Sequence, residues 1–203
     1  MIYRQRKQIR LRGYDYRNAG AYFVTICTHQ RRCTLGTVRN GVMRLNDWGQ
    51  IAVKIWRAMP EHFPYIILDV FQCMPNCMPN HIHFILWIIS DDAPNVLPEI
   101  SQAMVGQRHA FALPTEPPGK GTKSKSLGAI VGSFKSAVTR EINDRRSEKY
   151  PPIWQGRFHD RIIRSERELE AIRRYIWANP ANWQEDQNYD AGLDDYLNDI
   201  SPL

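Results

Sequence analysis

Hydrophobic and polar positions follow two different periods along the chain. β-Branched and aromatic side chains dominate the stretch from Ala21 to Thr28, and this composition predicts a buried strand. The stretches from Tyr65 to Cys73 and from His81 to Ile89 have the same character and predict two neighbouring strands joined by a short turn. A further strand or extended segment is expected between Ile153 and Ile163.

Two longer segments have apolar residues at the three- and four-residue spacing of an amphipathic helix. The first begins after Asn46 and is expected to end at Pro60, and the second runs from Leu127 to Ile142. Residues 90–126 precede the second helix and contain many prolines, glycines and lysines, so we expect a flexible insertion there. A weaker apolar pattern from Ala103 to Phe111 predicts a short helix within this insertion.

A third helix is expected over residues 166–178. The preceding Ser165-Glu-Arg-Glu168 fits a capping box, in which Ser165 and Glu168 satisfy each other's backbone amides at the helix start. Pro180 marks the far end of this helix. Its apolar stripe is formed by Leu169, Ile172 and Ile176.

The mixture of strands and helices indicates an α+β domain. We expect an antiparallel sheet of about four to five strands, with helices packed on its faces. A chain of 203 residues, of which 43% are hydrophobic, is long enough to bury one sizeable core. We therefore predict one domain over residues 1–183 with the insertion at about 90–126, followed by an acidic tail at 184–203.

The charge of the chain is unevenly distributed. Residues 184–203 contain six acidic residues and no lysine or arginine, so the rest of a chain whose formal net charge is +6 carries +12. Such a basic body favours a polyanionic partner, because each Lys or Arg that meets a phosphate releases condensed counterions. From charge alone, an ordinary solvated basic surface is an equally good interpretation.

Neither a membrane span nor a secretory signal is expected. No run approaches the roughly 20 apolar residues of a membrane helix, and the basic N-terminus leads into no signal-like apolar segment. The protein is therefore predicted to be cytoplasmic, and its four cysteines are predicted to be reduced.

His81 and His83 are candidate metal ligands. Side chains alternate along a strand, so both imidazoles point to one face while Ile82 and Phe84 point to the other. Two neutral imidazoles side by side can bind one divalent ion. Histidine pairs at this spacing also occur at surfaces or in ordinary hydrogen bonds, so the pattern alone leaves both interpretations open.

Tyr175 and Asn179 stand one turn apart on the third predicted helix, on a face next to its apolar stripe. This spacing lets a nucleophilic hydroxyl and an oxygen ligand be presented together. A tyrosine at the edge of the core and an asparagine that caps the helix before Pro180 give the same pattern. Spacing alone favours this structural interpretation.

Four separated blocks, taken together and in this order, carry a more specific signal. The blocks are Gly13-Tyr-Asp-Tyr16 with Ala19-Gly-Ala-Tyr-Phe-Val-Thr-Ile-Cys-Thr28; Met78-Pro-Asn-His-Ile-His83; Trp154-Gln-Gly-Arg-Phe158 with Ile162-Ile-Arg164; and Tyr175-Ile-Trp-Ala-Asn-Pro180. With these blocks the sequence resembles the single-tyrosine HUH transposases, and most closely the REP-associated tyrosine transposases of bacteria. The resemblance extends from Ile9 to about Trp183.

The resemblance implies an active site and a reaction. It makes His81 and His83 the metal ligands, Asn179 the third ligand and Tyr175 the nucleophile, with Mg²⁺ or Mn²⁺ as the cofactor. It implies an enzyme of DNA transposition and recombination that nicks single-stranded DNA and rejoins it through a 5′-phosphotyrosine intermediate. It also implies the HUH fold, which is ferredoxin-like, with the Tyr175 helix lying across the histidine face of the sheet.

The resemblance also implies the substrate, the hairpins of repetitive extragenic palindromes, and a nucleoid-associated location. The candidate DNA contacts are Arg10, Arg12, Lys135, Arg140, Trp154 and Arg157. Trp154 could equally stack on an unpaired base or pack in the core. Three acceptors stay open for the tyrosine proton, namely Lys135, His159 and water. The sequence also leaves open whether the protein is a monomer or a homodimer.

The sequence departs from the family pattern before the first histidine. Cys73-Met-Pro-Asn76 is followed directly by a second copy, Cys77-Met-Pro-Asn80, where the family has one Met-Pro-Asn unit. Because the extra unit has an even number of residues, we expect a lengthened turn that leaves His81 in place.

Other functions remain compatible with the motifs. One is a non-catalytic module that binds nucleic-acid hairpins, and another is a zinc hydrolase that uses the histidine pair. We also hypothesise that the acidic tail shields the basic cleft when DNA is absent.

Overall fold

The computed structural model describes residues 11, 13–39, 42–75, 80–89, 124–147 and 151–182. Arg10 and Arg12, the greater part of the insertion and the acidic tail lie outside the described residues. The short helix expected from Ala103 to Phe111 lies outside them too. The expectations for these segments therefore stay predictions.

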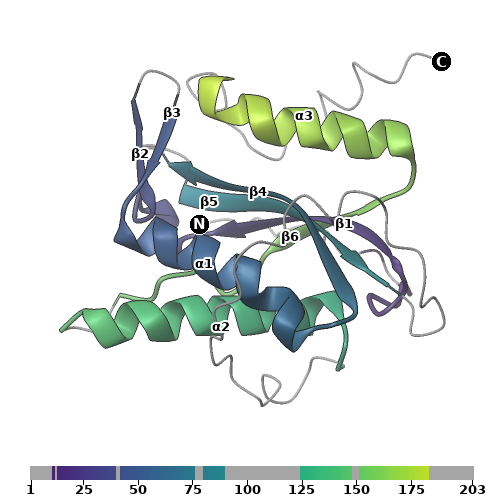
Figure 1. The fold of residues 1–203 in the computed structure, drawn as a ribbon, viewed down its shortest axis with the longest axis horizontal. Coiled ribbons are helices and arrows are strands. Elements are labelled where there is room, and N and C mark those ends of the chain that lie inside the picture. Colours follow the sequence, from purple (N-terminus) through teal and green to yellow (C-terminus); the bar gives the residue numbers. More distant parts are fainter. Residues whose placement is uncertain are drawn as a thin grey trace, which may run out of the picture.

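The centre of the molecule is a four-stranded antiparallel sheet with the strand order β4-β5-β1-β6 (Figure 1). Its strands are β1 (Gly20–Cys27), β4 (Ile66–Pro75), β5 (Asn80–Ile88) and β6 (His159–Ile163). The α+β fold with a sheet of four or five strands is thus confirmed, and β5 with His81 and His83 is a central strand, as expected.

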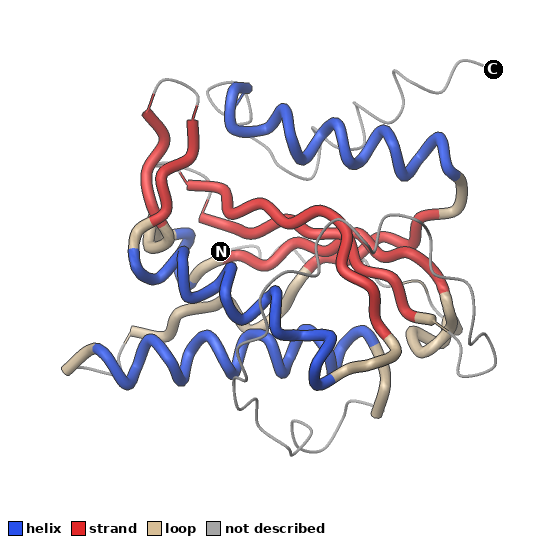
Figure 2. Tube along the Cα trace, in the orientation of Figure 1, coloured by secondary structure: helices blue, strands red, loops and turns tan. Residues whose placement is uncertain are grey.

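Helices cover both faces of this sheet. Helices α1 (Asp47–His62) and α2 (Leu127–Arg145) lie on one face, and α3 (Glu166–Asn182) is the one described helix on the other (Figures 1 and 2). The remaining elements are a short 3₁₀ helix η1 (His29–Arg31) and a separate two-stranded sheet made of β2 (Gly36–Arg39) and β3 (Val42–Leu45). The layers are therefore two helices, the sheet and then one helix.

The larger core lies between the sheet and helices α1 and α2. Because side chains alternate along a strand, every second residue of β1 and β5 points to this side. Trp56 of α1 and Phe134 of α2 meet Phe84 of β5 here, with ring centroids 4.5 to 6.3 Å apart. The β1 and β5 residues that belong to this core are Tyr22, Val24, Ile26, Ile82, Phe84, Leu86 and Ile88.

The smaller core lies under α3. Phe23 of β1 and Ile85 of β5 point to this side and are buried against the apolar stripe of α3. That stripe consists of Leu169, Ile172 and Ile176, as the sequence predicted. This arrangement confirms that the helix of Tyr175 lies across the face of the sheet that carries the two histidines.

A buried ion pair also holds α3 on the sheet. The guanidinium of Arg173 donates from Nε to Asp69 Oδ1 at 3.0 Å and from Nη2 to Asp69 Oδ2 at 2.5 Å. The side chains of Arg173 and Asp69 are only 11% and 7% exposed. Glu170 and the indole N–H of Trp87 complete this network. Apolar contacts have little directional preference, so this pair fixes where α3 sits along β4.

The N-terminus of α3 differs in one detail from the predicted capping box. The hydroxyl of Ser165 accepts from Glu168 N at 3.2 Å, as expected. The Glu168 carboxylate, however, accepts from the backbone N–H of Arg164 and from the side chain of Arg161 instead of from the N–H of Ser165. The capping residues thereby also tie the start of α3 to β6.

Two helix ends were predicted too early. Helix α1 continues to His62 and α3 to Asn182, so Pro60 and Pro180 both lie inside their helices. Each proline stands two residues before the helix end. A proline there costs a single backbone hydrogen bond of the last turn, which is why the helix can continue past it.

The ion pair leads to a prediction about stability. Arg173→Met leaves the Asp69 carboxylate buried without its counter-charge and should lower the free energy of unfolding by about 3–5 kcal/mol. The double variant Asp69→Leu with Arg173→Met removes both charges and should recover most of that loss. Urea denaturation of the three proteins measures both effects. Equal stability of the wild-type protein and Arg173→Met would contradict the proposed role of the pair.

Candidate active site

The two histidines of β5 lie close together beneath α3. His83 pairs with Thr25 and His81 with Cys27 across the β1–β5 ladder. Both imidazoles are buried, at 0% and 3% exposure, and their Nε2 atoms are 2.9 Å apart. The folding of β5 thus directs both rings toward one point, as the spacing predicted.

Thr25 holds the ring of His83 from the neighbouring strand. Its Oγ1 lies 3.0 Å from His83 Nδ1. When Nδ1–H donates to this hydroxyl, the lone pair of Nε2 faces His81, which is the tautomer that a metal ligand needs. Thr25 could not be predicted from the sequence, because its role depends on the pairing of residues 25 and 83 across two strands.

Burial keeps both imidazoles neutral. Burial, with smaller contributions from the nearby Arg31 and His159, lowers the pKa of His81 to about 3. Burial also lowers the pKa of His83 well below its ordinary value, with His81 contributing. Neutral imidazoles at physiological pH are ligands for a cation and poor proton donors.

Tyr175 reaches this histidine pair from α3. Its ring centroid lies 5.6 Å from that of His83 and 6.5 Å from that of Phe23. Its hydroxyl oxygen is buried. The fold therefore brings together His83 and Tyr175, two candidates that lie far apart in the sequence.

The geometry of the two imidazoles fits a shared divalent ion. Two ligand atoms bound at about 2.1 Å and at a right angle to each other are about 3.0 Å apart. The observed 2.9 Å between the Nε2 atoms matches this distance, and it is also the length of the hydrogen bond that joins the two neutral rings in this structure. Over the described part of the chain, no other His, Cys, Asp or Glu joins the pair to make a three-residue metal cluster. The backbone of Asn179 lies one turn beyond Tyr175 in α3, but its side chain is outside the described residues.

Two of the candidate DNA contacts, Trp154 and Lys135, form hydrogen bonds to backbone carbonyls within the protein. The indole of Trp154 is 7% exposed, packs against Phe134 and donates to the carbonyl of Lys135 at 3.1 Å. The ring of Trp154 is therefore part of the core, which is one of the two roles expected for it, and its stacking on an unpaired base stays a prediction. The ammonium of Lys135 donates to the carbonyls of Gln155 and Gly156, and burial lowers its pKa to about 8.

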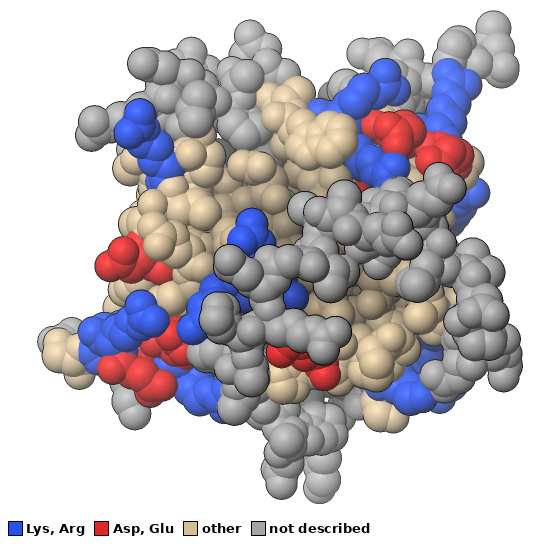
Figure 3. Space-filling model, in the orientation of Figure 1, with Lys and Arg blue, Asp and Glu red and all other residues tan. Residues whose placement is uncertain are grey.

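The other described candidates are at the surface. Arg140 on α2 and Arg157 before β6 are both exposed. On the face shown in Figure 3, the described basic side chains are interspersed with acidic ones and do not form a continuous basic field. The roles of Arg140 and Arg157 in DNA binding therefore stay predictions.

One comparison with solved structures defines the class of fold. The chain is similar to the "Structure of the REP associates tyrosine transposase bound to a REP hairpin", with a TM-score of 0.52 and 17% sequence identity. The match covers 85% of this chain and 73% of that chain. At this identity the likeness establishes that the two proteins share a fold.

A sequence comparison places the chain in a family. The chain is 36% identical over 185 residues to an uncharacterized protein of Haemophilus influenzae. This match covers 91% of this chain and 93% of that protein. The chain belongs to the same protein family as this Haemophilus protein. No protein-family model matches the sequence. None of the described helices is long and apolar enough to cross a membrane.

The neutral histidines lead to a pH prediction. Above about pH 6.5 they are neutral in both the folded and the unfolded chain and do not change stability. As the pH falls below 6.5, the unfolded chain binds protons that the folded chain excludes, down to about pH 3 for His81. The free energy of unfolding should therefore fall by about 1.4 kcal/mol per pH unit for each buried histidine.

The double variant His81→Asn with His83→Asn lacks both titrating groups. Its stability should fall less steeply than that of the wild-type protein between pH 6.5 and 4.5, although its stability at pH 7 is lower. Urea denaturation across this range measures the two slopes. Parallel slopes would mean that the imidazoles are protonated in the folded protein.

The imidazole pair also predicts a stabilising effect of metal. At a concentration of Mn²⁺ one hundred times its Kd, binding should add about 2.7 kcal/mol to stability. That corresponds to a rise in Tm of roughly 5–10 °C for a chain of this length. Differential scanning fluorimetry with Mn²⁺ and with Mg²⁺, then with EDTA, measures the shift. His83→Gln should abolish it, whereas His62→Gln, at the end of α1, should retain it.

Proposed function

We propose that the protein is a metal-dependent single-stranded DNA endonuclease and strand transferase that acts at hairpin DNA. The observation that carries this proposal is the position of Tyr175, whose ring lies 5.6 Å from that of His83 in a buried, neutral imidazole pair. A phenol beside two convergent ligand nitrogens is an arrangement suited to nucleophilic attack on a phosphodiester.

Each group has a separate task in this proposal. His81, His83 and Asn179 would hold Mg²⁺ or Mn²⁺, which supplies charge stabilisation at a non-bridging oxygen of the scissile phosphate. Thr25 orients the His83 ring. Packing against Phe23 and His83 restricts the orientation of the Tyr175 ring. Little entropy is then lost when the hydroxyl is positioned for attack.

The reaction itself exchanges one ester for another. The Tyr175 oxygen attacks phosphorus, the bond from phosphorus to the 3′ oxygen breaks, and a 5′-phosphotyrosine forms. The tyrosine loses its proton and the 3′ oxygen gains one. Because the phosphotyrosine retains a reactive ester, a 3′-hydroxyl can attack it in the reverse sense and reseal DNA without ATP.

The hairpin substrate is proposed from the fold. The structure that shares this fold was solved bound to a REP hairpin. The basic character of the chain before residue 184 is compatible with such a polyanionic partner. We therefore propose a hairpin with an adjoining single strand as the substrate, in the cytoplasm and at the nucleoid.

A covalent-adduct assay tests the proposed reaction. The protein is incubated with Mn²⁺ or Mg²⁺ and a set of labelled single-stranded hairpins with unpaired flanks, and then denatured. A protein–DNA band should form, should vanish with EDTA and should be absent in Tyr175→Phe, because phenylalanine has no oxygen to attack with. Tyr65→Phe, which removes a tyrosine hydroxyl between α1 and β4, is the matched control and should keep the band.

Other outcomes would identify the rival functions. Hairpin binding by the wild-type protein without any adduct would indicate a non-catalytic binding module. Cleavage without an adduct that survives in Tyr175→Phe would indicate a metal hydrolase. Either result would overturn the proposed function.

A further inference from the structure

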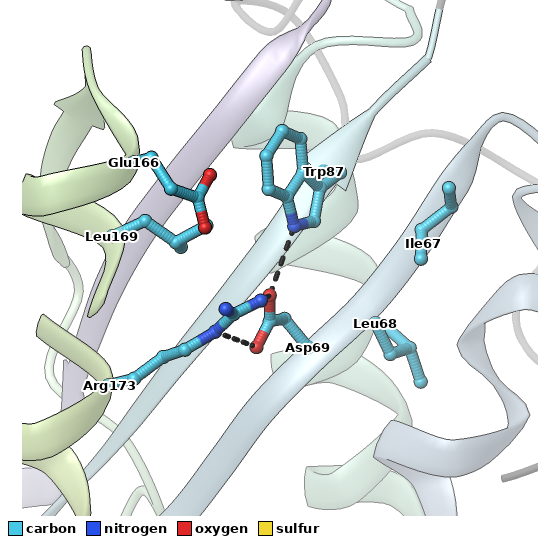
Figure 4. A pocket seen from close by; sticks show the side chains of 7 residues that line it. All are labelled: Ile67, Leu68, Asp69, Trp87, Glu166, Leu169 and Arg173. Atoms are coloured by element: carbon cyan, nitrogen blue, oxygen red, sulfur yellow. Dashed lines mark hydrogen bonds and ion pairs between the residues drawn. The ribbon is translucent and has the colours of Figure 1, made fainter. Parts of the chain in front are cut away.

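A second site on the α3 face is a hollow between the first half of α3 and strands β4 and β5. It encloses a volume of about 280 Å³. Figure 4 shows side chains from all three elements around it. Those that matter for its chemistry are Ile67, Asp69, Trp87, Glu166, Leu169 and Arg173. The volume is at the small end of the range of ligand pockets and suits a single heterocycle.

The walls of the hollow favour a flat, apolar ring. Leu169 and Ile67 contribute aliphatic surface, and Trp87 contributes an aromatic one. The indole of Trp87 is fixed in orientation, because its N–H donates to Asp69 Oδ2 at 3.1 Å. An aromatic ring that is already held in place can stack on a ligand ring with little further loss of entropy.

The charges in the hollow disfavour an anion. Arg173 is the positively charged side chain of the hollow. Two carboxylates neutralise its charge: Asp69 in a bidentate pair, and Glu170 three residues earlier in α3. No unneutralised positive charge is therefore left on the described walls to attract a phosphate. The phosphate backbone of DNA is not the group that this hollow suits.

Glu166 is the polar group that remains available. Its carboxylate is directed into the space between Trp87 and Leu169 (Figure 4). It forms no hydrogen bond or ion pair with any residue that the structure describes. An ionised carboxylate only accepts hydrogen bonds, and it accepts two parallel ones best. The hollow therefore combines a stacking surface with an acceptor for two N–H donors.

We propose that this hollow binds an unpaired guanine base of the DNA substrate. Guanine presents two adjacent donors, N1–H and the N2 amino group, to one carboxylate, whereas each other DNA base places an acceptor beside its N–H groups. This inference rests on the proposed function for its substrate and extends it to base recognition. The site gives the enzyme a preference for guanine in the single strand near the cleaved bond.

The position of the hollow agrees with this role. Trp87 lies four residues from His83 along β5, or about 13 Å at 3.3 Å per residue. Trp87 and Tyr175 also pack against the same apolar cluster beneath α3. A few nucleotides of single strand span the distance from the imidazole pair to the hollow.

Nucleoside binding can be tested independently of cleavage. The probes are 2′-deoxyguanosine, 2′-deoxyinosine, 2′-deoxycytidine, 2′-deoxyadenosine and thymidine, each titrated into the ¹⁵N-labelled full chain. The readout is the indole N–H signal of Trp87 in ¹H–¹⁵N spectra, assigned from its loss in Trp87→Phe. Deoxyguanosine should shift this signal at the lowest concentration. Deoxyinosine lacks the N2 amino group and should bind roughly fivefold more weakly.

Glu166→Gln should weaken deoxyguanosine binding about tenfold, because the amide N–H₂ opposes the donors of guanine. The matched control is Glu61→Gln, at the end of α1, which should leave binding unchanged. Equal shifts with all five nucleosides, an unchanged affinity in Glu166→Gln or no shift of the Trp87 signal would each overturn the proposal.

The same idea can be tested on a cleaved substrate. For a hairpin that forms the covalent adduct, guanine is replaced by inosine at one unpaired position at a time. One replacement should lower adduct formation in the wild-type protein and have no further effect in Glu166→Gln. If adducts form but no guanine matters, base recognition fails while the proposed function stands. If deoxyguanosine binds but no adduct forms with any hairpin, the proposed function fails while the nucleoside site stands.

Discussion

The arrangement of this protein depends on how α3 is seated on the sheet. The helix brings Tyr175 to a face of β5 where the described residues form a small apolar cluster. Such a cluster resists separation of the layers but allows sliding, because its contacts have little directional preference. The buried Asp69–Arg173 pair removes that freedom in the middle of the helix, and the more exposed Arg161–Glu168 pair adds a weaker contact at its start. The position of the Tyr175 ring over the imidazoles thus depends mainly on an ion pair that contacts neither.

The same burial that positions the histidines makes them costly for the fold. Two imidazoles with Nε2 atoms 2.9 Å apart, excluded from water, cannot both become protonated without strong repulsion. The protein therefore gives up stability at acidic pH to keep two neutral imidazole nitrogens directed at each other. A core that only needed to be filled would gain more from apolar residues at positions 81 and 83. This cost supports the proposal that the pair binds a metal.

Much of this arrangement could be predicted from local pattern. The alternation along β5 placed His81 and His83 on one face, and the stripe of α3 placed Leu169, Ile172 and Ile176 against the sheet. The contact between Tyr175 and His83 could not be derived from spacing, because it depends on how α3 crosses the sheet; it was expected only from the resemblance of several blocks. Thr25, Asp69 and Arg173 had no local signal, since each acts through a partner that is distant in sequence.

Other differences arose from signals that were present but not used. The β2–β3 hairpin was missed, although Asn40-Gly41 between alternating apolar residues is a strong hairpin signal. Trp154 was assigned to the surface or the core with equal weight, and the structure buries it against Phe134. Of the repeated Cys-Met-Pro-Asn unit, Cys73 to Pro75 end β4 and Asn80 begins β5, where Pro75 pairs with Asn80 and the His81 side chain is buried. The lengthened turn expected between them lies outside the described residues and stays a prediction.

The two sites on the α3 face are linked by a match of lengths. Glu166 and Tyr175 are nine residues apart on α3, or about 13 Å at 1.5 Å per residue. Trp87 and His83 are four residues apart on β5, also about 13 Å. The two sites are therefore about equally far apart along α3 and along β5, and Arg173 joins α3 to the neighbouring strand β4 between them. A rigid connection of this kind lets a base held at one end define which phosphate reaches Tyr175 at the other.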